Sequence, residues 1–198
     1  DATKDKRNLS DIVSGLMQHI ASNAPYYCLE SNDPRIEVII DEYAALYEQS
    51  HAWLKAMECQ LLTSQDKIVF HALVDDRQDK ILMLWPLVHS QTRGGRRIAS
   101  VESCYSTNCG VYFGAELDKF ELTRKLLLSV CQRYPWDELR LGPTDNPQVN
   151  KAIYSVGLFH KEFAVIGHWY EDQLSEFTAY LAARPSKLKN TIKRKSKK

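Results

Sequence analysis

Residues 67–89 decide the fold, and they read KIVFHALV (67–74), DDRQD (75–79) and KILMLWPLVH (80–89). Both apolar runs are typical of strands that are covered on two faces, and the charged residues between them indicate a turn. The sequence therefore predicts two neighbouring strands in the middle of a sheet. Pro86 cannot donate a hydrogen bond to an adjacent strand, so we expect a bulge or a sheet edge at this residue.

Downstream of this pair the sequence first predicts more strands. Gly94 and Gly95 indicate a hairpin turn. Shorter strands are expected at residues 97–104 and 111–115. From residue 118 onward the pattern changes and alternates between helix and strand.

Two helix starts mark this alternating part. Asp118 with Glu121 is like a capping box, and Asn146 followed by Pro147 combines a cap with a Pro in the first turn. A short buried strand at residues 138–141 is expected between the two helices. The first helix is expected to bury one face, formed by Phe120, Thr123, Leu127, Val130 and Tyr134, with Leu126 beside it.

The C-terminal part is expected to add one strand and two helices. Residues 162–170 are apolar on both faces, which favours a covered strand. Ser175 is a candidate cap for a helix that continues to Arg184, and a second helix is expected from Pro185 onward.

Upstream of the central pair the sequence is mainly helical. Residues 9–21 carry apolar side chains at helical spacing, and residues 23–35 are rich in loop-forming residues. Residues 36–61 predict helix with a break near Ser50, although residues 36–40 also fit a short strand. Strands that lead into alternating helices and strands predict a mixed α/β sheet with helices on both faces.

Composition bounds the class of protein. Five Cys are an odd number and are scattered among apolar neighbours, which argues against a disulfide framework and for a reducing, cytoplasmic location. No apolar run is long enough to cross a bilayer, and residues 1–20 lack the apolar centre of a signal peptide. We therefore expect a cytoplasmic protein without a membrane span.

Positive charge is concentrated at the C-terminal end of the chain. The chain has 26 Lys and Arg against 25 Asp and Glu, and seven of the basic residues lie in residues 187–198, which contain no acid. Three interpretations compete for this segment: a linker helix, an anion-binding surface and a nucleic-acid-binding tail. Lys187, Lys189 and Arg194 are the candidate anion contacts. The acidic remainder of the chain argues against nucleic acid.

Four strings, in this order and spacing, carry a resemblance to a known family. They are SHAWL (50–54), WPL (85–87), WDELRL (136–141) and FTAYLAARPSKLKNTIKRKSKK (177–198). Most of the chain after residue 46 resembles the GNAT superfamily of acyltransferases. More specifically it resembles the tandem-domain branch related to FemAB-like aminoacyltransferases and to acetyltransferases found with bacterial cellulose synthesis genes.

This resemblance implies a domain order and a function. Together with the residue pattern, it predicts an N-terminal helix and loop (1–35), a GNAT-like domain (36–184) and a basic linker helix (185–198) that leads to a second GNAT domain. The parent enzyme would transfer an acyl group from acetyl-CoA or another acyl-CoA to an amine or hydroxyl of a small-molecule or peptide-like acceptor. The acyl-CoA site would lie in the second domain, so this half is expected to be inactive alone. The alternatives are a complete single-domain acetyltransferase and a module that binds anions or nucleic acid.

Candidate acceptor contacts lie at predicted strand ends and turns. They are Tyr105, Asn108, Tyr112 and Asp145. Strand ends border the ligand cleft of open α/β sheets, which favours a role in substrate binding. The competing interpretation is that they are ordinary residues at the boundary of the core.

Three other motifs are rejected at this stage. Residues 91–96 (QTRGGR) approach the phosphate-loop pattern of GNAT enzymes but fall between two strands, where no helix supplies a dipole, so they predict a hairpin. Cys104 and Cys109 do not fit the spacing of a zinc site, and no metal site is expected. His71 lies inside an apolar strand and is expected to be a hydrogen-bonded core residue. The catalytic base stays unassigned.

Overall fold

The two apolar runs form the central strands of the sheet, β2 (Asp66–Asp75) and β3 (Lys80–Thr92). They pair antiparallel, from Asp66 opposite Ser90 to Asp75 opposite Lys80. Residues 68–74 and 81–88 are buried without interruption, which shows that both strands are covered on two faces. The predicted central pair is confirmed.

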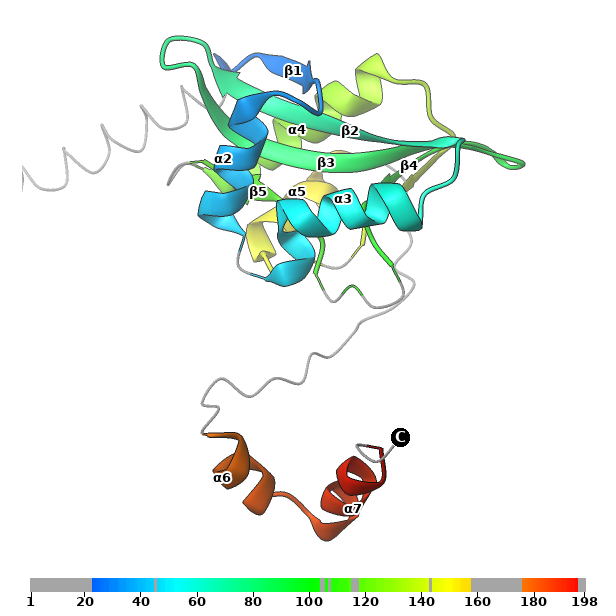
Figure 1. Cartoon of the computed structure of the whole chain (residues 1–198). Coiled ribbons are helices and arrows are strands. Elements are labelled where there is room, and N and C mark those ends of the chain that lie inside the picture. Colours follow the sequence, from blue (N-terminus) through cyan, green and yellow to red (C-terminus); the bar gives the residue numbers. More distant parts are fainter. Residues whose placement is uncertain are drawn as a thin grey trace, which may run out of the picture. The chain divides into compact units, whose positions relative to one another are not determined.

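The computed structural model describes residues 23–44, 46–103, 106, 108–114, 118–142, 144–157 and 176–195 (Figure 1). The chain divides into two units, Asp1–Phe163 and Ala164–Lys198, and each is described by itself. The helix predicted at residues 9–21, the strand at 162–170 and the cap at Ser175 lie outside the described residues. The boundaries of the three expected domains stay a prediction.

Four further strands complete the described sheet, namely β1 (Tyr26–Leu29), β4 (Gly95–Ser100), β5 (Tyr112–Phe113) and β6 (Glu138–Arg140). The order is β1-β2-β3-β4-β6, and β5 pairs with β3 beside β4. All these pairs are antiparallel except β4 with β6, which are parallel. The prediction of a mixed α/β sheet is confirmed.

Pro86 lies where β3 changes its partner. Leu84 pairs with β5 and Leu87 pairs with β4, so Pro86 faces no strand on that side. The expected sheet edge is therefore present as a local gap that tolerates a residue without an amide hydrogen. The bulge alternative is wrong, because the register irregularity lies between Leu73 and Val74.

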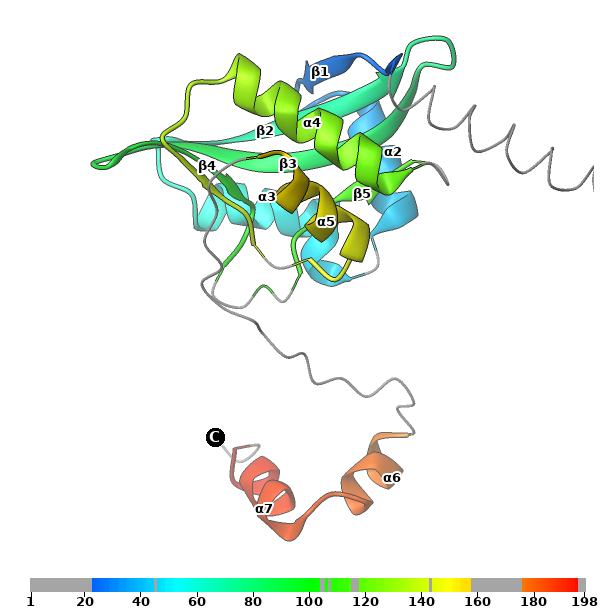
Figure 2. The ribbon, with the colours of Figure 1, turned by 180° about the vertical axis from the view of Figure 1, so that it is seen from behind.

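Helices cover both faces of the sheet. In Figure 1, α2 (Pro34–Tyr43) and α3 (His51–Gln60) lie in front of the sheet, and Figure 2 shows α4 (Lys119–Arg133) and α5 (Pro147–Ser155) on the opposite face. Each face has its own apolar core. This two-sided cover explains why β2 and β3 are apolar at almost every position.

The chain before β2 contains more secondary structure than the sequence predicts. Residues 26–29, expected in a loop, form the strand β1, because they pair with the neighbouring strand β2. Residues 36–40 are helical, since Asp33 caps α2 by accepting the amide hydrogen of Arg35 at 3.0 Å. The break at Ser50 is confirmed: its hydroxyl accepts the Trp53 amide at 3.2 Å and begins α3.

Two burial predictions need correction. The buried residues of α4 are Leu122, Thr123, Leu126, Leu127 and Val130. Phe120 is only half-buried and Tyr134 follows the helix as its C-cap, so the buried face is centred closer to Leu126 than expected. In β6, Glu138 and Arg140 are exposed, because β6 pairs only with β4 among the described residues.

The second unit contains two described helices, α6 (Phe177–Ala182) and α7 (Ser186–Lys195). The Pro185 carbonyl accepts the amide of Lys189 at 3.2 Å, which confirms the second helix predicted from Pro185. The Lys189 ammonium group donates to the Ala182 carbonyl at 2.7 Å and so ties α7 to the end of α6.

Candidate functional site

A polar cavity of about 280 Å³ opens where the segments after β5 and β6 lead into α4 and α5. Its polar lining includes Asn108, Lys119 and Asp145, and its apolar lining includes Leu46 and Phe113. Four separate parts of the chain meet here: the connection between α2 and α3, the segment that contains β5, the start of α4, and the segment that leads into α5. A hollow with apolar walls and a few polar groups is the usual form of a small-molecule site.

The cavity brings together two of the four predicted acceptor contacts, Asn108 and Asp145. Tyr112 is 1% exposed, and its hydroxyl donates to the Gln49 backbone carbonyl, so its side chain belongs to the core of the α2 and α3 face. Burial also raises the pKa of Tyr112, which keeps the hydroxyl protonated. Tyr105 lies outside the described residues.

Asn108 is the most informative residue of the cavity. Its backbone amide donates to a carboxylate oxygen of Glu48 at 2.8 Å, which fixes its position. Its side chain is 5% exposed, and the side-chain oxygen is buried without a hydrogen-bond donor among the described residues. An acceptor left in this state costs about 1–3 kcal/mol, so a ligand that donates a hydrogen bond here would recover that free energy.

Two helix N-termini border the cavity, and both are capped by side chains of the chain itself. At α4, the Asp118 carboxylate accepts the Glu121 amide at 3.1 Å. At α5, the Asn146 side-chain oxygen accepts the amides of Gln148 and Val149 at 3.0 and 3.4 Å. These caps take donors that a phosphate group would need, and the charges of Asp118 and Glu121 repel an anion.

Cys109 also lines the cavity but is unsuited to act as a nucleophile. Burial, together with the nearby Glu102 carboxylate, raises the pKa of the Cys109 thiol to about 12. Because the thiolate is the reactive form, a thiol with this pKa is inert at neutral pH. Cys104, the other cysteine considered from the sequence, lies outside the described residues.

A cluster of hydrogen-bonded side chains around His71 lies beneath α4. The Tyr26 hydroxyl and His71 Nδ1 are 2.6 Å apart, and the Nε2 atoms of His71 and His89 are 2.9 Å apart. The two imidazole centroids are 5.1 Å apart, so the Nε2 atoms face each other and share one proton in an N–H···N hydrogen bond. Both ring nitrogens of His71 are thus hydrogen-bonded, which confirms it as a satisfied core histidine.

Gln49, Lys119 and Asn146 are among the cavity residues that were not found as site residues from the sequence. Lys119 is the first residue of α4, so the capping signal at Asp118 contains a clue to its position. Asn146 was recognised only as a helix cap. Nothing in the local sequence links Gln49 to Asn108, because their proximity depends on the packing of distant segments.

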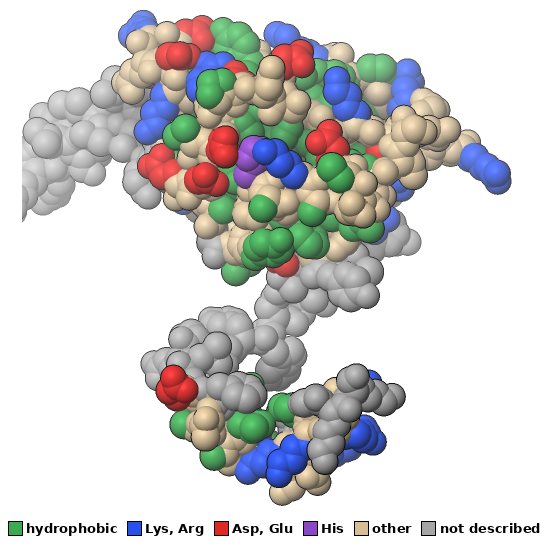
Figure 3. Space-filling view, viewed as in Figure 1, with side chains coloured by type: hydrophobic (Ala, Val, Ile, Leu, Met, Phe, Trp, Pro, Cys, Tyr) green, Lys and Arg blue, Asp and Glu red, His purple; other side chains and the backbone are tan. Residues whose placement is uncertain are grey.

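The candidate anion contacts lie in the second unit. Lys187 and Arg194 are exposed on α7, and Lys189 is half-buried. Lys193, Arg194 and Lys195 occupy the last turn, where cations interact favourably with the helix dipole. Figure 3 shows the basic side chains gathered on this helix.

Within the described part of the chain, no helix combines the length and apolar character needed to cross a membrane. The same residues contain no cluster of three or more His, Cys, Asp or Glu that is arranged to hold a metal ion.

Comparisons with known proteins concern the fold. No protein-family model matches the chain, and no curated protein matches it in sequence. A solved structure described as a probable acetyltransferase is 15% identical with a TM-score of 0.46, and the match covers 75% of this chain and 99% of that one. A possible acetyltransferase from Clostridium difficile 630 is 15% identical with a TM-score of 0.44, and the match covers 74% and 97%. The term acetyltransferase describes those two proteins.

Proposed function

We propose that this chain is the first half of a GNAT-type acyltransferase and that the cavity beside Asn108 binds the acyl acceptor. The parent enzyme would transfer an acyl group from an acyl-CoA to an amine or hydroxyl. The order of strands and helices supports the proposal, as do the four strings quoted above. The FemAB-like relationship, the second domain and the cytoplasmic location belong to the same proposal.

One observation supports the acceptor site most directly: Asn108 and Asp145 line one cavity, and the buried side-chain oxygen of Asn108 has no described donor. An amine or hydroxyl acceptor would donate to this oxygen, and a protonated amine would also interact with the Asp145 carboxylate. Lys119 lies in the same lining and could contact an anionic part of the acceptor.

The caps of α4 and α5 support the absence of an acyl-CoA site from this half. A CoA pyrophosphate needs free amide donors and a positive field, and helix N-termini commonly supply both. Here the two N-termini beside the cavity carry their own acceptors, Asp118 and Asn146. The cofactor therefore fits better on the expected second domain, beyond α7.

The acceptor site is tested by titrating the chain with glycinamide, a small primary amine, and following amide shifts by NMR. Asn108→Leu and Asp145→Asn should each weaken binding about tenfold, which corresponds to the loss of one hydrogen bond to a charged group. Glu138→Gln, an exposed change on β6 outside the cavity lining, is the matched control. Binding that is equal in all variants would place the amine elsewhere and contradict the proposed site.

The basic helix α7 supports a second candidate function, the binding of an anionic polymer. Lys187, Lys189 and Arg194 would then contact phosphates. Fluorescence anisotropy with duplex DNA tests this alternative. It requires an affinity that falls steeply with salt and disappears when residues 187–198 are deleted. The acidic remainder of the chain, with 19 basic against 25 acidic residues, favours the acyltransferase.

A further inference from the structure

A second cavity, of about 200 Å³, lies between α2 and the edge formed by β3 and the end of β5. Its apolar lining includes Val38, Ile39, Ile81 and Gly114. Its apolar side chains suit contact with the aliphatic side chains of a packed protein segment.

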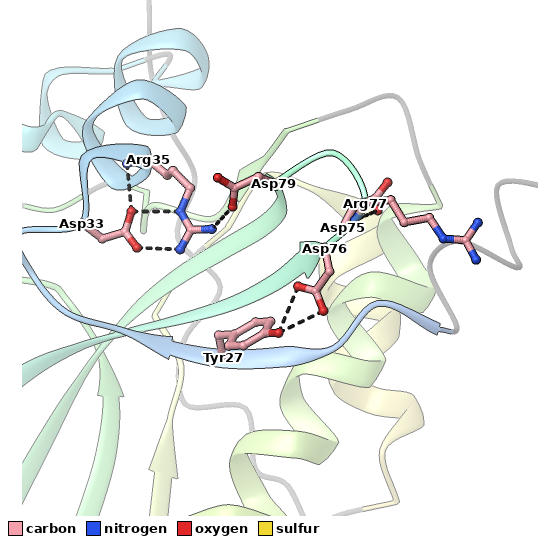
Figure 4. A network of polar contacts seen from close by, with 7 residues as sticks. All are labelled: Tyr27, Asp33, Arg35, Asp75, Asp76, Arg77 and Asp79. Atoms are coloured by element: carbon pink, nitrogen blue, oxygen red, sulfur yellow. Dashed lines mark hydrogen bonds and ion pairs between the residues drawn. The ribbon is translucent and has the colours of Figure 1, made fainter.

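The walls of this cavity are held in place by polar contacts. The Arg35 guanidinium group bridges two carboxylates, Asp33 at 2.6 Å and Asp79 at 2.5 Å, and thereby ties the start of α2 to the turn before β3 (Figure 4). Gly114 is also part of the lining. A Cβ at Gly114 would lie 2.0 Å from the Ile81 carbonyl oxygen, so only glycine allows this close approach.

The exposed part of the lining contains the hydrophobic residues Val38 and Tyr43, next to the charged residues Glu42, Asp79 and Lys80. Val38 is 64% exposed although it lines the cavity, and Tyr43 is 37% exposed. Figure 3 shows hydrophobic side chains interspersed with charged ones on this face of the first unit. A lone exposed Val is ordinary, but an exposed Val at the mouth of an apolar cavity indicates a place where another segment packs.

The described chain begins close to this cavity. The Pro25 carbonyl accepts the Val74 amide at 3.1 Å, and Val74 pairs with Ile81, which lines the cavity. Pro25 and Ile81 are thus two strand spacings apart, about 10 Å. Figure 1 shows the start of β1 beside the turn between β2 and β3.

The 22 residues that precede the described chain contain a suitable occupant. Residues 9–21 place Leu9, Ile12, Val13, Leu16 and Ile20 on one face at helical spacing. Leu16 precedes Asn23 by seven residues, which is about 10 Å along a helix. This reach matches the distance from the start of β1 to the cavity. A helix of this length is marginal alone and needs a surface for its apolar face.

We propose that residues 9–21 of this chain form a helix that packs against α2 and inserts Leu16 into the cavity beside Val38. The proposal goes beyond the acyltransferase function and does not depend on it. It accounts for an apolar cavity with fixed walls, for the exposure of Val38 and for the apolar face of residues 9–21. The N-terminal segment would then cover α2 as part of the fold.

A double-mutant cycle in the full chain tests the contact. Leu16→Asp and Val38→Asp should each lower the melting temperature by at least about 4 °C, because each places a charge in an apolar contact. The double variant should melt no lower than the more affected single variant. Gln18→Asp, on the opposite side of the same predicted helix, is the control and should leave the melting temperature unchanged.

Every other outcome overturns the proposal. An unaffected Leu16→Asp or Val38→Asp chain shows that the two residues do not meet, and additive effects show that they pack against different partners. Sedimentation that reveals a wild-type dimer, dissociated by Val38→Asp, assigns the surface to a second copy. If either Asp variant fails to fold, Leu16→Ala and Val38→Ala replace them. Hydrogen exchange of residues 34–43 then gives the readout, and it should accelerate in both Ala variants.

Discussion

His71 is wholly buried on the α4 face of the sheet, next to Tyr134. Burial, and secondarily His89, lower the pKa of His71 to about 3. Burial and the neighbouring Lys67 lower the pKa of His89 as well. The Arg133 guanidinium lies 4.9 Å from the Tyr26 ring centroid, so a proton on the histidine pair would be added near existing positive charge.

The pKa of His71 predicts a loss of stability in acid. The unfolded chain binds a proton below the ordinary histidine pKa of 6.5, whereas the folded chain resists protonation until about pH 3. The free energy of unfolding should therefore decrease as the pH is lowered from 6.5 to about 3, by about 1.4 kcal/mol per pH unit at most. Urea denaturation at pH 7, 6, 5 and 4 measures the slope.

The control for this prediction removes the titrating ring. His71→Leu should be less stable at pH 7, because Tyr26 and His89 each lose a hydrogen-bond partner, but its stability should depend less on pH. Carboxylates titrate in both proteins, so the difference between the two slopes is the relevant quantity. Equal slopes would show that His71 is protonated in the folded chain.

Two adjacent glycines of the β3–β4 hairpin, Gly94 and Gly95, differ in how much room each leaves for a side chain, so their Ala variants can be compared directly. Gly95 has a φ of 121°, and a Cβ there would lie 2.6 Å from a carboxylate oxygen of Asp137. At Gly94 the nearest atom would be 3.8 Å away. Gly95→Ala should lower the free energy of unfolding by about 1–3 kcal/mol. Gly94→Ala should change it by less than about 1 kcal/mol, and comparable losses would contradict this account of the turn.

At the scale of elements, the cap of α4 has a measurable effect. Asp118→Ala removes the acceptor of the Glu121 amide and should destabilise the chain by about 1 kcal/mol in urea denaturation. Asp118→Asn keeps an acceptor oxygen and should retain most of the stability. If the Asn and Ala variants are equally unstable, the charge of Asp118 matters more than its hydrogen bond.

Elements set by local signals could be predicted from the sequence. The caps Asp118 and Asn146 and the break at Ser50 were found because each of these residues satisfies backbone amides within three residues of itself. Strand β1 was missed because its four residues become a strand only through pairing with β2, more than 40 positions downstream. The cap at Asp33 was also overlooked, and the β-branched residues after it left helix and strand both open.

The candidate site was predictable only in part, for the same reason. Asn108 and Asp145 were chosen because they follow strands, and the ends of neighbouring strands meet at one edge of a sheet. Tyr112 satisfies the same sequence criterion, yet its side chain points into the core. In a strand, successive side chains point to opposite faces, and a two-residue strand gives too little pattern to assign the face.

At the scale of the molecule, the first unit carries the features on which the proposed acceptor site rests. The first unit has a cavity lined by Asn108, whose buried side-chain oxygen accepts no hydrogen bond from the described residues. The two helix N-termini beside this cavity are capped by side chains. These features favour a ligand that donates hydrogen bonds over a ligand that carries a polyphosphate. The basic charge is concentrated in residues 187–198.

The proposed absence of an acyl-CoA site from this chain predicts how the chain responds to acetyl-CoA. A ligand that binds the folded chain at 100 times its Kd stabilises it by about 2.7 kcal/mol, which raises the melting temperature by several degrees. Because Asp118 and Asn146 already cap the two helices beside the cavity, acetyl-CoA at millimolar concentration should leave the melting temperature of this chain unchanged. Glycinamide, at concentrations well above its Kd from the NMR titration, should raise it. A saturable rise with acetyl-CoA would instead identify a complete acetyltransferase domain, since the cofactor would then bind without the second half.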